Sequence, residues 1–423
     1  MDAKKKKRIN RLQNASIIVL SVFALCLFFY TFAPTADTKW EKLANIFSSH
    51  AQSTSFGTEQ SVSALSAPLQ IAVTGQHGRF GCTATLSDEA LFPLNILLKE
   101  AFGSAGNAAS TTEEAFRAAL LQSGVYYDFS VSLPTHLLSS MLDTDLSAIP
   151  TDAVRRLLLS VDGDTVRLFS FDGAEYHVSA TAISPVTLES SIALFEPNDT
   201  AFLFERSDTG HTLDPFTLIT EDMLSRPEYL CTTPSAAGES DRLLEYLGFN
   251  SHSNSRYVES DGTEVIFGSD ATIRIETDGT VTYTGPRHSD AVFQAEGTDS
   301  ASAIAAAYRI ASGLLSSSAG DAALYFAGLE ETKDGYTVSF DYTLNGTPIR
   351  FRDGSSAASV TLSDGVITAF SLHCRSYTLS DTALRPLPLT QALAIASDKQ
   401  GTLGISYVDN GTNSLSISWI VMQ

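Results

Sequence analysis

The chain has 423 residues, 43% of them hydrophobic, which is enough for two or three domains that each bury a core. Its formal net charge is −21, and because the first eleven residues contribute +5, the remainder carries −26. Such a surface repels phosphate backbones and anionic headgroups, so nucleic acid is excluded as a partner, and lipid binding by the main body is disfavoured.

An uncharged apolar stretch near the start, residues 15–32, predicts a transmembrane helix within residues 14–34. At about 1.5 Å per residue it covers about 27 Å, enough to cross a thin hydrocarbon core. Residues 1–13 contain six Lys and Arg and form a basic tail, which stays in the cytoplasm. We therefore expect a single-pass cell-membrane protein whose C-terminal ectodomain is extracellular.

A cleaved signal peptide is the alternative interpretation of this stretch. Its apolar core is usually about 7–15 residues, shorter than the one here, and Pro34 stands where a cleavage site needs a small residue. Uncleaved anchoring is the favoured hypothesis. Ser21, Ala24 and Phe28 form a stripe on which a partner helix can pack, with lipid contact as the alternative.

Residues 35–66 are predicted to form a juxtamembrane helix followed by a linker. Trp40, Leu43, Ile46 and Phe47 recur at helical spacing, and Trp40 suits the membrane interface. The Ser-, Thr- and Gln-rich residues that follow are typical of a linker.

Residues 67–233 are predicted to form an N-terminal α+β domain. Ser110, three residues before Glu113, gives a capping-box pattern that predicts the start of a helix ending at Gly124. The other expected elements are strands at 69–74, 82–86, 125–131, 166–169 and 176–182 and helices at 91–102, 133–141 and 152–159.

Two further domains are predicted, a β-meander at residues 234–297 and a C-terminal α+β domain at residues 298–423. The meander has a short helix followed by four alternating strands, and the last domain places antiparallel strands around two helices. Tight hairpin turns are expected at nine Asp-Gly or Asn-Gly dipeptides, which begin at Asp162, Asp172, Asp261, Asp278, Asp334, Asn345, Asp353, Asp364 and Asn410.

Motifs that mark catalysis or metal binding were sought and not found in the sequence. There is no phosphate-binding Gly-rich loop with Lys, no His-Glu-x-x-His, no Cys-x-x-Cys and no Gly-x-Ser-x-Gly. Asp162 and Asp164 bracket a turn, which suits a hairpin better than a glycosidase pair. His373 and Cys374 are adjacent on a predicted strand and point to opposite faces. We predict no catalytic residue, no cofactor-binding residue and no metal ligand.

The four cysteines do not form a disulfide framework. Cys26 lies in the predicted span, and Cys82, Cys231 and Cys374 are more than a hundred residues apart. Three cysteines cannot all pair within one chain. We expect buried or half-buried thiols, with one bridge left open as an alternative.

Several stretches together resemble the YycH/YycI family, and YycH in particular. They are residues 68–74, 124–129, 133–135, 244–249, 257–265, 273–275, 278–283, 405–407 and 415–419, together with the basic tail and anchor. The resemblance implies a YycI-like fold for the last domain. It also implies a regulator, without an active site, that binds the sensor histidine kinase of a two-component system controlling cell-wall metabolism in Gram-positive bacteria. A YycI-like paralogue is a further implied partner, and the bilayer holds the N-terminal helix.

Two hypotheses of function follow from the sequence. The first is the membrane-anchored regulator, and the second is an envelope enzyme or binding protein that acts on a cell-wall polymer or an exported ligand. Tyr126, Tyr127 and Phe129 can line a groove in the second hypothesis, although alternating core positions are the commoner role for such residues. A deep pocket with convergent polar groups would favour the second hypothesis.

Overall fold

The computed structural model describes residues 65, 67–83, 91–146, 149–206, 212–219, 225–233, 244, 247, 255–268, 270–287, 293–315 and 318–422. The contacts divide the chain into Met1–Ser55 and Phe56–Gln423, and all described residues belong to the second unit. Within these residues no helix has the length and apolar character that crossing a bilayer requires. The predicted transmembrane and juxtamembrane helices lie outside the described residues.

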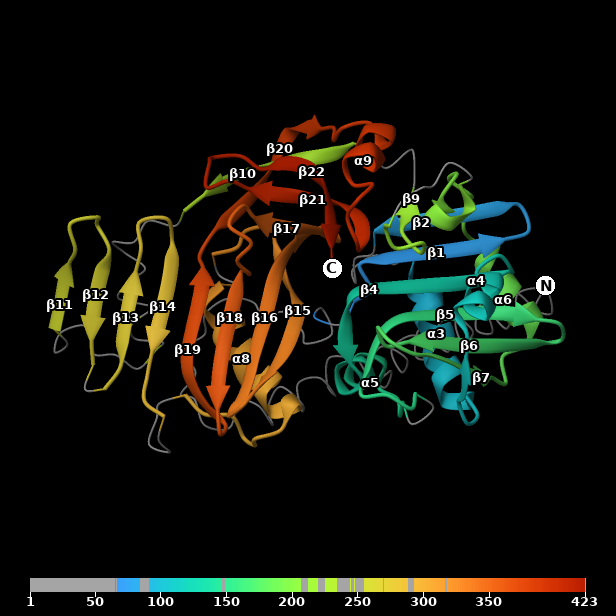
Figure 1. Ribbon diagram of the computed structural model, residues 1–423, viewed down its shortest axis with the longest axis horizontal. Helices are drawn as coiled ribbons and strands as arrows, with labels where there is room; N and C mark the ends of the chain where they lie inside the picture. Colours follow the sequence, from blue (N-terminus) through green and yellow to red (C-terminus); the bar gives the residue numbers. More distant parts are fainter. Residues whose placement is uncertain are drawn as a thin grey trace, which may run out of the picture. The chain divides into compact units, whose positions relative to one another are not determined.

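The N-terminal part is built on a seven-stranded sheet with the order β2-β1-β4-β5-β6-β7-β3 (Figure 1). Every pair in it is antiparallel. Its strands are β1 Gln70–Gly75, β2 Gly78–Thr83, β3 Ala109–Thr111, β4 Gly124–Pro134, β5 Ala153–Asp162, β6 Thr165–Phe171 and β7 Tyr176–Ala180.

Both faces of this sheet are covered, because consecutive apolar side chains of its central strand β4 point to opposite faces. Tyr127 packs into one core with residues of α3 (Phe92–Ser104), α5 (Thr135–Leu142) and α6 (Pro185–Ile192). Tyr126 points the other way, into a second core. That core contains residues of α4 (Glu113–Ala119) and of the small pair β8 (Ala201–Phe202) and β9 (Leu218–Ile219). The interpretation of Tyr126, Tyr127 and Phe129 as core residues is confirmed, since each is buried.

Two local predictions for this part were wrong. Residues 152–159, expected to be helical, lie mostly in strand β5, where Leu157, Leu158 and Leu159 are all buried because helices cover both faces of the sheet. A short continuous apolar run fits a fully buried strand as well as a helix. The cap of α4 is Thr112, whose hydroxyl accepts from the Ala115 N–H, while Ser110 lies in β3.

The C-terminal part contains an eleven-stranded sheet with the order β11-β12-β13-β14-β19-β18-β16-β17-β21-β22, and β15 also pairs with β16. Its only parallel pair among the described strands is β17 with β21. The strands are β11 Ser255–Val258, β12 Glu264–Phe267, β13 Thr272–Ile275, β14 Thr280–Thr284, β15 Ala323–Thr332, β16 Gly335–Leu344, β17 Thr347–Phe351, β18 Ala358–Ser363, β19 Val366–His373, β21 Thr402–Asp409 and β22 Ser416–Met422.

Pairing of β14 with β19 makes the predicted meander continuous with the strands that follow it. Val281 lies opposite Leu372 in this pair. Helix α8 (Ser300–Leu315) packs on β16, β18 and β19 through a row of Ala, Ile and Leu at helical spacing. The three domain limits stay a prediction.

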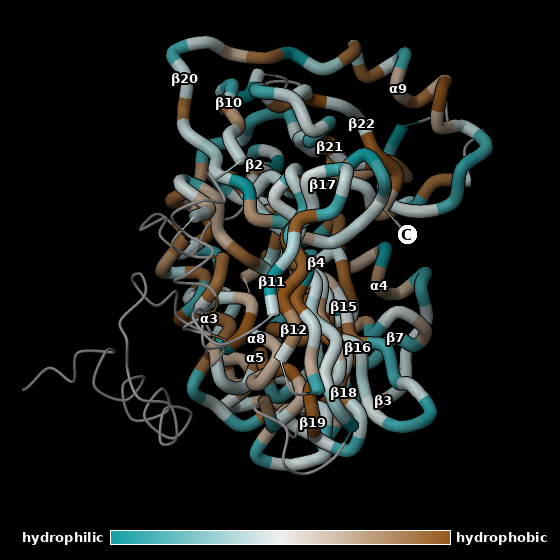
Figure 2. The backbone as a smooth tube through the Cα atoms, turned by 90° about the vertical axis from the view of Figure 1, so that its left-hand side faces the viewer, coloured by the Kyte–Doolittle hydropathy of each residue, from teal (hydrophilic) through white to brown (hydrophobic). Residues whose placement is uncertain are grey.

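The remaining elements are a second, two-stranded sheet and a short helix. A separate two-stranded sheet joins β10 (Arg226–Thr232) to β20 (Ser376–Leu384), and α9 (Leu389–Ile395) precedes β21. Figure 2 shows hydrophobic stretches along the strands and hydrophilic residues at many of the turns between them. The predicted α+β class with mostly antiparallel sheets is confirmed, with six α-helices among the described residues.

All nine expected turns place their glycines in the left-handed backbone region, but only eight join paired strands, because Asp353-Gly354 connects β17 to β18 and these two strands pair with other strands. All nine glycines that follow Asp or Asn in these dipeptides have a positive φ, from +61° at Gly163 to +157° at Gly335. The Asp162–Asp164 segment is a hairpin turn between β5 and β6, as predicted.

Candidate functional site

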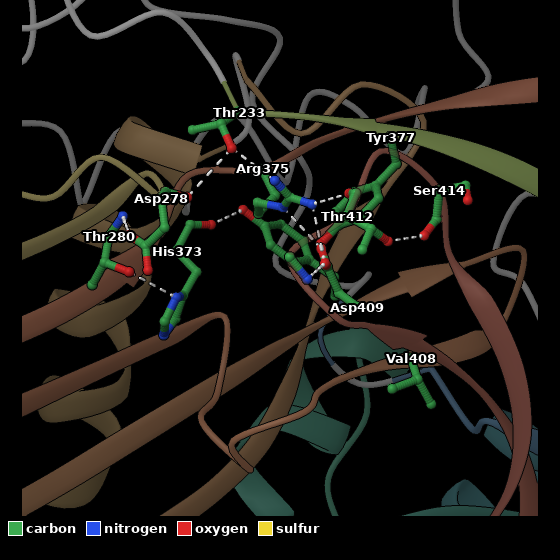
Figure 3. Close-up of polar contacts among 12 residues, drawn as sticks. Thr233, Asp278, Thr280, His373, Arg375, Tyr377, Val408, Asp409, Thr412 and Ser414 are labelled. Carbon is green, nitrogen blue, oxygen red and sulfur yellow. Dashed lines mark hydrogen bonds and ion pairs between the residues drawn. The ribbon is translucent and has the colours of Figure 1, made fainter.

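A buried charge cluster in the C-terminal part is centred on Arg375 and Asp409 (Figure 3). Arg375 Nε lies 2.9 Å from Asp409 Oδ2 and Nη2 lies 3.0 Å from Oδ1, so the guanidinium binds both carboxylate oxygens. Their side chains are 8% and 1% exposed. This bidentate arrangement is the strongest form of the Arg–carboxylate pair.

Four further groups complete the cluster. Tyr377 donates its hydroxyl to Asp409 Oδ2 at 3.0 Å, and the Gly411 N–H donates to Oδ1 at 2.8 Å. Arg375 also donates to Thr233 Oγ1 at 2.7 Å and to the Thr412 carbonyl at 2.9 Å. The cluster therefore joins β20, the end of β21, the loop after it and the residue that follows β10.

The electrostatics of the cluster favour the charged pair. Burial alone would lower the pKa of Arg375, but its hydrogen bonds to Asp409 and the charge of that carboxylate outweigh burial and raise the pKa. Burial and the Asp409 charge raise the pKa of the Tyr377 hydroxyl, which stays protonated as a donor. Arg375 and Asp409 carry opposite charges, and their contacts hold the neighbouring strands and the loop after β21 together.

His373 and Cys374 lie beside this cluster. The His373 ring stacks on Phe351 at 4.7 Å, and its Nδ1 is 3.2 Å from Thr280 Oγ1. Burial lowers the pKa of His373 and outweighs nearby carboxylates such as Asp353, which raise it. Cys374 donates its backbone N–H to the Gly279 carbonyl at 2.9 Å. Both residues thus take part in attaching the β13–β14 turn to the end of β19.

A second buried cluster surrounds Arg156 in the N-terminal sheet. Arg156 Nε lies 3.2 Å from Asp128 Oδ2, Nη2 forms an ion pair with Asp214, and the guanidinium lies over the Phe216 ring at 5.1 Å. Thr402 at the start of β21 donates to Asp214 Oδ2 at 3.2 Å. This cluster connects the N-terminal sheet to the C-terminal sheet through Asp214.

Two hollows on the described surface are small. One holds about 50 Å³ beside Ser130 and Trp419, and the other holds about 220 Å³ beside Glu331, Lys333 and Asp334. Binding sites for small molecules usually enclose about 300–1,000 Å³. No group of three His, Cys, Asp or Glu side chains among the described residues has the spacing of a metal site.

The predicted helix-contact residues Ser21, Ala24 and Phe28 lie outside the described residues. None of the three cysteines that the structure describes forms a disulfide, and Cys231 is buried while Cys82 and Cys374 are half-buried, as expected. Sequence reasoning missed both buried Arg clusters. Arg156 has one local signal, since it is a basic residue inside the apolar strand β5, whereas Arg375 lies between β19 and β20 and has none. Neither position reveals which distant carboxylate completes the pair.

No family model matches this chain, and no curated protein matches it. Among solved structures, the crystal structure of YycH from Bacillus subtilis is similar, with a TM-score of 0.55 and 10% sequence identity. The alignment covers 86% of this chain and 95% of that one. The chain therefore has a YycH-like fold.

Proposed function

We propose that the protein is a membrane-anchored extracytoplasmic regulator that binds and modulates the sensor histidine kinase of a two-component system controlling cell-wall metabolism. The observation that carries the proposal is the YycH-like fold, which extends over 86% of the chain. The resemblance of residues 244–249 and 257–265 to the YycH/YycI family supports it from the sequence.

The proposal includes the localisation of the protein in the cell membrane. The uncharged residues 15–32 with a basic flank support a single-pass anchor, a cytoplasmic N-terminus and an extracellular main body. A kinase in the same membrane is then reachable both by the anchor helix, through Ser21, Ala24 and Phe28, and by the folded part. A YycI-like paralogue is a second proposed partner.

The described geometry is compatible with a protein that works through contacts. The buried guanidinium groups of Arg156 and Arg375 each form an ion pair with carboxylates, and these ion pairs connect separate strands. We propose that the chain has no enzymatic activity. The two hollows described above are smaller than the usual small-molecule site and give no support to the hypothesis of an envelope enzyme or binding protein for wall polymers.

Co-purification of the full chain from membranes tests the proposal. A tagged chain solubilised in mild detergent is expected to recover a sensor histidine kinase, identified by mass spectrometry, and to change its autophosphorylation rate in vesicles. The double substitution Ser21→Leu and Ala24→Leu is expected to lower recovery, because it fills the small-residue stripe, whereas Val22→Leu leaves it unchanged.

Two results would contradict the proposal. One is a wild-type preparation that recovers no histidine kinase with the anchor intact. The other is hydrolysis of purified wall fragments by the protein at a rate that scales with its concentration, which would support the enzyme hypothesis instead.

A further inference from the structure

Several strand edges in the described part of the chain are occupied by other segments. At the edge of β2, the Asn198 side chain accepts from the Gly81 N–H at 2.9 Å and donates to the Gly81 carbonyl at 2.7 Å. The Cys231 N–H on the outer edge of β10 donates to the Asn413 carbonyl at 2.8 Å, and the Tyr377 N–H of β20 donates to the Ala319 carbonyl at 3.0 Å. Covering edges in this way prevents uncontrolled strand pairing.

Strand β11 is different. It is the terminal strand of the eleven-stranded sheet, and all four of its residues are exposed (Figure 1). Tyr257 is 47% exposed and Val258 65% exposed, and Tyr257 stacks on Phe267 of β12, itself 41% exposed, at 5.8 Å. The edge has no Pro and no bulge in its pairing with β12. It thus presents apolar side chains on both faces and an extended backbone to solvent.

The hydrogen-bond register shows which peptide groups face outward. The Glu259 N–H donates to the Thr263 carbonyl at 2.8 Å, so these two residues form a hydrogen-bonded pair at the end of the hairpin. Antiparallel pairs alternate, which makes Tyr257–Val265 the next hydrogen-bonded pair and Val258–Glu264 a pair without ladder bonds. The N–H and C=O of Val258 therefore point away from β12, along the open edge.

Charge near this edge favours a basic occupant over a second copy of the chain. The β11–β12 turn carries Glu259 and Asp261, and the β13–β14 turn at the same end of the meander carries Glu276 and Asp278. Arg274 is paired with Glu259, with Nη2 2.6 Å from Oε2, and Arg256 of β11 is paired with Glu264. Two guanidinium groups therefore face five carboxylates, which leaves this end negative. The chain beyond its first eleven residues carries −26, so two copies repel each other.

We propose that β11 is a docking edge to which an extended segment of the kinase's extracytoplasmic part adds as a further strand. The segment has apolar side chains over Tyr257 and Val258 and a Lys or Arg beside Asp261. Backbone hydrogen bonds supply affinity in such strand addition, and alternate side chains supply specificity. This inference rests on the proposed function and adds the surface through which it operates.

The test uses the tagged full chain in membranes with the substitution Val258→Pro. Proline lacks the outward N–H and is tolerated at an edge strand whose N–H faces solvent, so the fold is retained and the added strand loses a hydrogen bond. Kinase recovery is expected to fall at least tenfold. Val258→Thr is the matched control, since it keeps the N–H and the β-branched shape, and recovery should stay near the wild-type value.

A photo-cross-linking amino acid at Val258 gives a second measurement that does not depend on the proline variant folding. Its cross-link is expected on one extended segment of the kinase, and the same probe at Val186, which is 75% exposed on α6, is expected to give none there. Undiminished recovery with Val258→Pro, or a cross-link to a second copy of this chain, overturns the docking edge alone. Absence of any kinase in the wild-type sample overturns the proposed function as well.

Discussion

Arg156 and Asp214 form a buried ion pair that links the N-terminal sheet to the segment bonded to β21. Arg156 belongs to β5, while the Asp214 N–H donates to the Gly401 carbonyl at 2.8 Å. The same carboxylate accepts from Thr402 at 3.2 Å. One acidic side chain therefore holds residues that are 58 and 188 positions away in the sequence.

The first prediction concerns the pH dependence of this pair. Burial would raise the pKa of Asp214, but the Arg156 charge and the hydrogen bonds from Arg156 and the Phe216 N–H outweigh it and lower the pKa from 3.8. A carboxyl whose pKa is lower in the folded state stabilises the fold above its unfolded pKa. That contribution is lost as the pH falls through the lower, folded value.

Urea unfolding of the wild type and Asp214→Asn at pH 7 and at steps below pH 4 checks this prediction. At pH 7 the substitution should lower the free energy of unfolding by about 3 kcal/mol, because it removes one of the two carboxylates that pair with the buried Arg156 guanidinium. The difference between the two proteins should shrink as the pH falls below 3.8. A difference that grows on acidification would contradict it.

Asp409→Asn is predicted to destabilise the protein strongly. The substitution leaves the buried Arg375 guanidinium without its carboxylate, which typically costs about 3–5 kcal/mol. Chemical denaturation measures the loss in the free energy of unfolding. Asp381→Asn on the exposed part of β20 is the control and should change it by less than about 0.5 kcal/mol. Equal effects of the two substitutions would refute the structural role of the cluster.

Cys231 is predicted to resist alkylation in the folded protein. It is 0% exposed, and burial together with the Asp409 charge raises the pKa of its thiol to about 12. Because the thiolate is the reactive form, iodoacetamide at pH 8 should label Cys82 and Cys374, which are half-buried, before Cys231. Peptide mass spectrometry follows the order, and all three should react alike in urea. Early labelling of Cys231 would show that β10 opens readily.

Gly279→Ala is predicted to cost more stability than Gly163→Ala. Both glycines have a positive φ, +92° and +61°, so both substitutions introduce backbone strain of about 1 kcal/mol or more. A Cβ at Gly279 would also lie 2.5 Å from the Cys374 carbonyl oxygen, whereas a Cβ at Gly163 meets nothing within 4 Å. Thermal unfolding measures the difference in melting temperature between the two variants, and equal melting temperatures would contradict the prediction.

Local patterns predicted the elements whose cause is local. Eight of the nine Asp-Gly and Asn-Gly hairpin turns were correct because a positive φ is a property of one residue, and the Val, Tyr and Phe residues of 125–131 favour the strand found there as β4. The error at β5 has the opposite cause. Leu157 to Leu159 are buried on both faces, and this depends on helices distant in the sequence.

The charge clusters were not predictable from the sequence for a related reason. Arg375 and Asp409 are 34 residues apart, and Arg156 and Asp214 are 58 apart. No periodicity relates such partners, since only the three-dimensional path of the chain brings them together. The predicted contact stripe of Ser21, Ala24 and Phe28 lies outside the described residues and stays a prediction.

The pairing of β14 with β19 has a mechanical consequence. Backbone hydrogen bonds run without interruption from Ser255–Val258 to β19 and onward, and Thr280 sits opposite His373 at the end of that ladder. A force applied to β11 is therefore resisted by the backbone hydrogen bonds between successive strands. No flexible hinge separates the meander from β19. The meander should therefore move together with β19 and the strands beyond it. A force on β11 would be transmitted through the sheet to the core of the C-terminal part.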